Sequence, residues 1–229
     1  MFYIDPTYFW YVFIPTLLIS LGVQIYLKST ISKWSQVRNG SGEFGYQVAQ
    51  QIFNRTSLSA IPMERIKGDM TDHFDPGANI VRFSETTAGK NSVAAMAIAA
   101  HELGHVQQYQ TGSALIKARS FLLPALQFSP ILSYIGILLG LWFNMTGMLY
   151  LGILFFGLMV LFSILTLPVE IDASKRGLRL LDEAGLMVTA EDKQGSKSVL
   201  RAAGLTYLAA ALTSILQLLY YISIAKRRG

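Results

Sequence analysis

The chain has 229 residues, of which 52% are hydrophobic and 14% are charged, and its mean hydropathy is +0.40. This balance lies well above that of soluble domains and indicates an integral membrane protein. The absence of cysteine excludes a disulfide framework, a thiolate metal ligand and a cysteine nucleophile. The net charge of +5 comes from basic residues scattered among acidic ones, so we expect no nucleic-acid partner.

Four apolar segments are long enough to cross a membrane as helices, because a bilayer core of about 30 Å needs about 20 helical residues. None of the four contains Asp, Glu, Lys or Arg. Pro15, Pro124 and Pro130 are expected to bend or shorten the first two segments. The predicted spans are residues 8–27, 121–143, 145–167 and 205–224.

Little more than Asn144 separates the second and third spans, which predicts a tight hairpin that returns the chain to its starting side. The polar segments 28–120 and 168–204 then lie on the same side of the membrane and make one domain-sized unit. Of the 19 Lys and Arg residues, ten fall in the first polar segment, six in the second and three in the C-terminal tail. The positive-inside rule therefore predicts a cytoplasmic unit, although the tail counts against this orientation.

The first polar segment contains three predicted kinds of element. A helix is expected over 42–54, whose apolar residues share one face. The stretches 61–68 and 78–84 are typical of short strands, and DHFDPG between them favours a turn, so we expect a small hairpin or sheet. The strand 78–84 could be an edge that pairs with an extended peptide. Asn91 and Ser92 are suitable N-caps for an alanine-rich helix over 93–110.

This last helix carries two of the three histidines of the chain, in the sequence HELGH. His101 and His105 are four residues apart, so both rings lie on one helix face and can bind one Zn²⁺ ion. In such HExxH sites the glutamate, here Glu102, is a general base and not a ligand. Gly104 costs about 1 kcal/mol of helix propensity relative to alanine, which suits close approach of another backbone or a substrate. The alternative is a purely structural histidine pair.

A catalytic zinc site needs a third protein ligand and an open position for water. A histidine six residues after His105 is excluded because Thr111 stands there, so the ligand must come from farther along the chain. Glu170 and Asp172 follow the third span directly, and the predicted hairpin brings them back to the same membrane surface. On a helix the two carboxylates point to nearly opposite faces, so one of them is expected to reach the metal.

We predict Glu170 as the third ligand, because its helix face holds small residues that permit close packing against the alanine-rich histidine helix: Ala173, Ser174 and Gly177. Asp172 shares its face with basic residues, which is typical of a solvated, ion-paired face or an anion-stabilising cluster: Lys175, Arg176 and Arg179. Asp172 is therefore expected to support the ligands from outside or to be structural.

The third histidine, His73, lies upstream in TDHFDPG. Close to the cleft it could donate to a developing oxyanion or contact the substrate. The commoner arrangement is a turn histidine bonded to Asp72 or Asp75, and we favour this structural role.

The chain resembles the YugP-like family of bacterial membrane zinc metallopeptidases in DHFDPGANIVRFSE, SVAAMAIAAHELGHVQQ, LPVEIDASKRGLRLL and RAAGLTYLAAALTSILQLLYY. The resemblance implies a gluzincin-like site in which His101, His105 and Glu170 bind zinc and Glu102 is the base, as the spacing also indicates. It further implies a distant similarity to the membrane-integrated HtpX-type proteases, whose third ligand is likewise a glutamate on a later helix.

The predicted fold is mainly α, with about four transmembrane helices and a small α+β zincin-like catalytic domain at the membrane surface. Its expected parts are an N-terminal transmembrane anchor (1–27), a catalytic segment (28–120), a transmembrane hairpin (121–167), a third-ligand helix segment (168–204), and a C-terminal transmembrane helix with a basic tail (205–229).

The predicted function is that of a multi-pass zinc metalloendopeptidase of the bacterial inner membrane. Its partners would be the lipid bilayer and peptide or membrane-protein substrates. The alternative is a catalytically silent zinc-binding scaffold or partner-binding protein, which the presence of Glu102 beside both histidines disfavours. A transporter is disfavoured because the spans lack the ionisable residues that mark an ion path.

Overall fold

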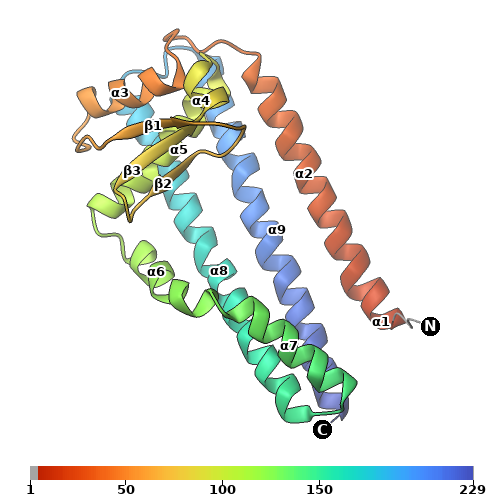
Figure 1. Cartoon of the computed structure of the whole chain (residues 1–229). Helices are drawn as coiled ribbons and strands as arrows, with labels where there is room; N and C mark the ends of the chain where they lie inside the picture. The colour runs from red at the N-terminus through yellow and green to blue at the C-terminus, as the bar shows by residue number, and fades with distance from the viewer. Residues whose placement is uncertain (1–4, 229) are drawn as a thin grey trace. The chain divides into compact units, whose positions relative to one another are not determined.

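The structure, a computed structural model, describes residues 5–228 and is mainly helical with one small sheet (Figure 1). It separates into two compact units. The apolar unit comprises Met1–Gln24, Lys117–Pro168 and Thr206–Gly229, and the polar unit comprises Ile25–Ile116 and Val169–Leu205. Parts of three long helices and the first residues of a shorter one belong to the polar unit, and the rest of each belongs to the apolar unit.

The described part of the apolar unit consists of helices and short connections. It contains α1 (Pro6–Tyr8), the π-helix η1 (Phe9–Phe13), the start of α2 (Ile14–Ser35), most of α6 (Ala114–Leu126), α7 (Ser129–Trp142), the first part of α8 (Thr146–Glu183) and the last part of α9 (Ala190–Arg228). Within residues 5–228, three helical stretches are long and apolar enough to cross a membrane: Pro6–Ser35, Thr146–Glu183 and Ala190–Arg228.

The second predicted span is not one continuous helix. It is broken between α6 and α7, whose axes differ by 52°, and the pair counts as a fourth span only if both helices are taken together. Pro130 explains the position of the break, because it lacks the N–H that would continue the α6 ladder but fits the first turn of α7. The prediction of about four spans is thus confirmed as three or four.

A tight turn joins α7 (Ser129–Trp142) to α8, at the place where the second and third spans were expected to turn back. Only Phe143–Met145 separate α7 from α8, and Asn144 has a positive φ of 53°, a conformation that asparagine adopts more readily than most residues. Glycines let the two helices approach closely. A Cβ on Gly136 would lie 2.7 Å from the Cα of Gly152, on the facing helix.

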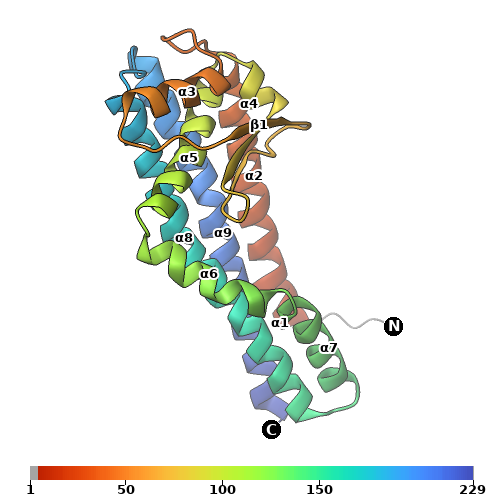
Figure 2. The ribbon, with the colours of Figure 1, turned by 60° about the vertical axis from the view of Figure 1, so that its left-hand side comes forward.

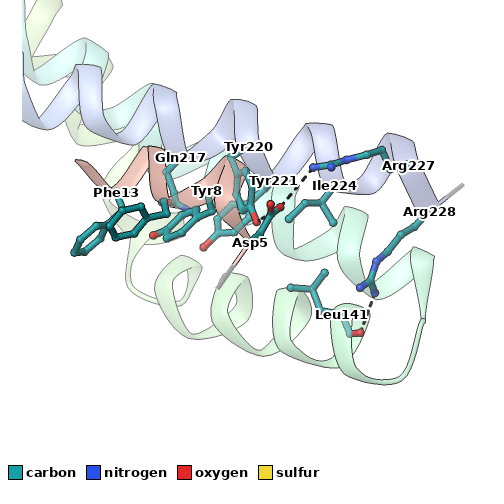
Figure 3. Close-up of a pocket in the computed structure, with 11 residues that line it drawn as sticks. Asp5, Tyr8, Phe13, Leu141, Gln217, Tyr220, Tyr221, Ile224, Arg227 and Arg228 are labelled. Atoms are coloured by element: carbon teal, nitrogen blue, oxygen red, sulfur yellow. Dashed lines mark hydrogen bonds and ion pairs between the residues drawn. The ribbon is translucent and has the colours of Figure 1, made fainter. Parts of the chain in front are cut away.

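An open cavity of about 870 Å³ lies within the apolar unit, between its N-terminal helices and α9 (Figure 3). The Tyr220 hydroxyl donates to Asp5 at 3.1 Å, and the Arg227 guanidinium lies 3.9 Å from the same carboxylate. Arg228 donates to the carbonyl oxygen of Leu141 at 2.9 Å. These contacts tie the end of α9 to the start of the described chain and to α7.

The polar unit holds the sheet and shorter helices. Its elements are α3 (Gly45–Arg55), β1 (Met63–Ile66), β2 (His73–Asp75), β3 (Ile80–Ser84), α4 (Glu85–Gly89) and α5 (Val93–Gln110), with segments of α2, α8 and α9. Its core contains buried side chains from β3, α5 and α8, among them Phe83, Leu103 and Leu180. The helices expected over 42–54 and 93–110 are confirmed, and Ser92 caps α5 by accepting from the N–H of Ala95 at 3.2 Å.

The sheet differs from the expectation because it contains an additional strand, β2, and because residues 78–84 do not lie at its edge. Its order is β1-β3-β2, with β1 parallel and β2 antiparallel to β3, and β2 and β3 lie against α5 (Figures 1 and 2). The expected turn DHFDPG therefore contains a strand, and the turn follows from Pro76. The expectation that residues 78–84 form an edge is wrong, because β3 has a strand on each side. Arg82 of β3 bridges both neighbours through Glu64 and Asp75.

Helices α5 and α8 pack backbone to backbone. A Cβ on Gly177 would lie 2.6 Å from the carbonyl oxygen of Ala100, and a Cβ on Gly104 would overlap the carbonyl oxygen of Ala173. Real Cβ atoms essentially never approach backbone atoms this closely. The small-residue packing expected for this face of α8 is therefore present, and it requires glycine at both positions.

We predict that Gly177→Ala destabilises the protein by about 1–3 kcal/mol, because the added methyl group forces α5 and α8 apart. Gly204→Ala on α9 is the matched control, since a Cβ there meets nothing within 4 Å. Alanine at this position should gain about 1 kcal/mol of helix propensity. Apparent melting temperatures in detergent should therefore move in opposite directions, and a fall of equal size in both variants would contradict the packing argument.

Candidate metal centre

Two helices of the polar unit bring three metal-ligand side chains together. His101 and His105 lie on one face of α5, and Glu170 lies on α8. The Oε2 atom of Glu170 is 3.3 Å from Nε2 of His101 and 3.4 Å from Nε2 of His105. One ligand atom from each residue lies within 4.8 Å of the others, so the three could hold a metal ion.

The donor set fits zinc. Two imidazole nitrogens and a carboxylate oxygen are ligands that catalytic zinc sites combine, with a further position left for water. The Glu170 side chain is 4% exposed, whereas each histidine side chain is 13% exposed. The centre is thus buried on the side of α8 and retains some access to solvent beside the histidine rings.

The electrostatic surroundings favour a cation at the same place. Burial by itself would lower the pKa of the His105 imidazole, because it disfavours the charged form. The carboxylates of Glu170 and Glu102 outweigh this effect and hold the pKa of His105 above its ordinary value. Groups that stabilise a proton on this ring would stabilise a metal cation beside it in the same way.

Each histidine has a hydrogen-bond partner on its other ring nitrogen. Nδ1 of His101 is 3.2 Å from the Ser174 hydroxyl, and Nδ1 of His105 is 3.0 Å from Oε1 of Gln108. Such partners orient metal-binding imidazoles. The sequence reasoning gave Ser174 only a packing role and missed Gln108. The available signal was helical spacing, since Ser174 follows Glu170 by four residues and Gln108 follows His105 by three.

Asp172 lies outside the ligand set. Its Oδ2 atom accepts a hydrogen bond from Nε2 of Gln108 at 2.8 Å and from Nε of Arg176 at 2.7 Å. The carboxylate therefore contacts a side chain that itself contacts His105, and it is paired with the basic residue four positions later on α8.

Glu102 is buried beside the ligand set. Its Oε2 atom accepts a hydrogen bond from the backbone N–H of Phe74 at 2.9 Å, so β2 holds this carboxylate in place. The ring of Phe74 packs against Tyr109 of α5 at a centroid distance of 5.5 Å. The strand that the sequence reasoning took for part of a turn is thus the element that fixes the orientation of Glu102.

His73 is exposed on β2 and does not belong to the group of metal-ligand residues. Its Nδ1 lies 2.8 Å from the carbonyl oxygen of Thr71, and its Nε2 lies 3.5 Å from the Arg82 guanidinium. The expected acidic partners have other uses. Asp72 accepts hydrogen bonds of 2.8–3.0 Å from Ser84 and Thr87 at the start of α4. Asp75 accepts one of 2.8 Å from the Arg82 guanidinium.

Comparison with known proteins identifies the family of the chain. A model of the family described as "Putative neutral zinc metallopeptidase" matches residues 9–226. The chain is also similar to the "Putative membrane protease YugP" of Bacillus subtilis (strain 168), with 37% identity over 210 residues that cover 90% of this chain and 91% of the relative. No solved structure is significantly similar. Because the family match spans nearly the whole chain, the protein belongs to this zinc metallopeptidase family.

Proposed function

We propose that the protein is a membrane-anchored zinc metalloendopeptidase that cleaves peptides or membrane proteins at the membrane surface. The observation that carries this proposal is the convergence of His101, His105 and Glu170 on one point, with the buried Glu102 carboxylate held beside them. The family and the similarity to YugP support the same activity.

In the proposed mechanism, the two histidines and Glu170 would hold zinc in a gluzincin-like site. Zinc in such a site supplies Lewis acidity and lowers the pKa of water. The Glu102 carboxylate takes a proton from the attacking water and passes it to the amine that leaves when the peptide bond breaks. The Phe74 N–H holds Oε2 of Glu102 during both steps, which keeps the base at a constant orientation.

The order of the elements supports four membrane crossings. His105 precedes α6 and Glu170 follows the apolar part of α8, yet both belong to the polar unit. The chain between them must therefore leave and return on the same side. Helix α8 provides one crossing, and the broken pair of α6 and α7 provides the other. From the distribution of Lys and Arg, we propose that the polar unit faces the cytoplasm of a bacterial cell.

Glu102→Gln should keep the zinc and abolish peptide cleavage, because an amide of the same size cannot accept the proton of water. The loss expected for a general base is about 10²–10⁴-fold. The measurement compares the membrane proteomes of cells that make either form, counting new N-termini and proteins that accumulate intact. Glu85→Gln, an exposed change on α4, is the control. Cleavage by Glu102→Gln at the rate of the unchanged protein would refute the mechanism.

Glu170→Ala should lower zinc affinity far more than Asp172→Ala does, because only Glu170 offers an oxygen to the metal. For Asp172→Ala we expect a loss below about tenfold, at the low end of the range for residues that contact a ligand indirectly. Elemental analysis and chelator competition on the purified proteins provide the measurement. If Asp172→Ala lowered zinc affinity more than Glu170→Ala, the two roles would be exchanged. If the wild-type protein bound no zinc even when zinc is supplied, the metal site would be refuted.

Reporters fused to the N- and C-termini should both indicate the non-cytoplasmic side, because an even number of crossings places both ends on one side. A reporter inserted in the polar unit, for example in the β2–β3 turn at Gly77, should indicate the cytoplasm. Reporters that place the two termini in different compartments would contradict the four-span topology.

A further inference from the structure

Gln108 is a fully buried glutamine on α5, one helical turn after His105. Burying an amide group costs free energy unless its polar atoms form hydrogen bonds. Three such bonds are present here, and all of them involve residues at or beside the metal centre. The same residue type elsewhere on α5 behaves differently, since Gln110 is exposed and bonds with the backbone of Ser59.

The hydrogen bonds fix which way the Gln108 amide points. Its nitrogen Nε2 donates to the carbonyl oxygen of Val169 at 2.9 Å and to Oδ2 of Asp172 at 2.8 Å. Only the nitrogen of an amide can donate to two acceptors. Turning the amide over would set its oxygen against two other oxygens, so Oε1 must face His105.

The orientation of the amide determines which nitrogen of His105 carries a proton. Oε1 of Gln108 can only accept a hydrogen bond, and it lies 3.0 Å from Nδ1 of His105. Nδ1 therefore carries a proton. Nε2 is then the atom available to a metal, and it is the atom that lies 3.4 Å from Glu170.

The same amide also holds the backbone beside the third ligand. Val169 immediately precedes Glu170 on α8, and its carbonyl oxygen accepts from Gln108. One side chain thus contacts the ring of one ligand and the peptide next to another, across the interface of α5 and α8. Asp172, in turn paired with Arg176, is the second acceptor that keeps the amide nitrogen in place.

We propose that Gln108 is a positioning residue of the metal centre: it sets the protonated nitrogen and ring orientation of His105 and fixes that ring relative to Glu170. Asp172 acts on the centre through Gln108 and not by contact with the metal. This inference rests on the proposed zinc site.

The test replaces Gln108 with methionine, which has a similar length and cannot accept the proton of Nδ1 or donate to Val169 and Asp172. Chelator competition should show zinc binding weakened by about 10–100-fold, the usual effect of removing a partner of a metal-binding histidine. Gln110→Met makes the same chemical change two residues along the helix and should alter zinc affinity less than about twofold. Equal affinity of Gln108→Met and the unchanged protein would overturn the inference while leaving the zinc site intact.

The double variant Gln108→Met, Asp172→Ala distinguishes positioning from general destabilisation. If Asp172 acts through Gln108, removing both costs no more zinc affinity than removing Gln108 alone, because coupled residues are not additive. Full additivity of the two losses would show that Asp172 acts independently and would overturn that part of the proposal.

A nuclear magnetic resonance measurement tests the inference without a variant, on the protein before and after zinc is added. The chain has three histidines, so ring nitrogens labelled with ¹⁵N give few signals. His105 should carry a slowly exchanging proton on Nδ1 both before and after zinc is added. A His105 ring protonated only at Nε2 would overturn the role of Gln108. A protein that shows the Nδ1 proton but binds no zinc would instead contradict the proposed function.

Discussion

The candidate metal centre depends on the close approach of α5 and α8. At Gly104 and Gly177, the backbone of the facing helix occupies the space that a Cβ atom would need. Any larger residue at either position would separate the helices, and the separation between Glu170 and the two histidines would grow with it. Metal-ligand distances tolerate changes of about 0.2 Å. The two glycines therefore decide whether Glu170 lies close enough to His101 and His105 to bind the same metal ion.

The same close contact creates an electrostatic problem that a bound cation would relieve. Glu102 and Glu170 are both buried, and buried carboxylates are costly unless they are paired and hydrogen-bonded. A backbone N–H contacts Glu102, and the two imidazoles contact Glu170. A divalent ion between the histidines and Glu170 would offset the remaining negative charge, so metal binding and the stability of this helix interface should be linked.

The sequence was sufficient to predict those features of the candidate site that follow from local spacing. The i, i+4 histidines and the small-residue face of α8 follow from helix periodicity, and the structure brings Glu170 to the histidines as the hairpin argument predicts. Prediction from the sequence missed the features that depend on tertiary contacts. Strand β2 is three residues long and lies within a turn-like sequence, so only its pairing with β3 defines it. The role of Gln108 likewise depends on acceptors about 60 residues away.

In the proposed topology, two crossings between His105 and Glu170 return the chain to the side of the histidines, and this explains how a residue so distant in sequence can complete the candidate site. The number of crossings between His105 and Glu170 has to be even, whatever the shape of each crossing. Pro130 ends one helix and begins another, which changes the path of the chain but not this number. The bend between α6 and α7 is therefore compatible with a site formed by the histidines before it and Glu170 after it. In that topology, loss of either the α6–α7 crossing or the α8 crossing would instead place Glu170 on the opposite side of the membrane from the histidines.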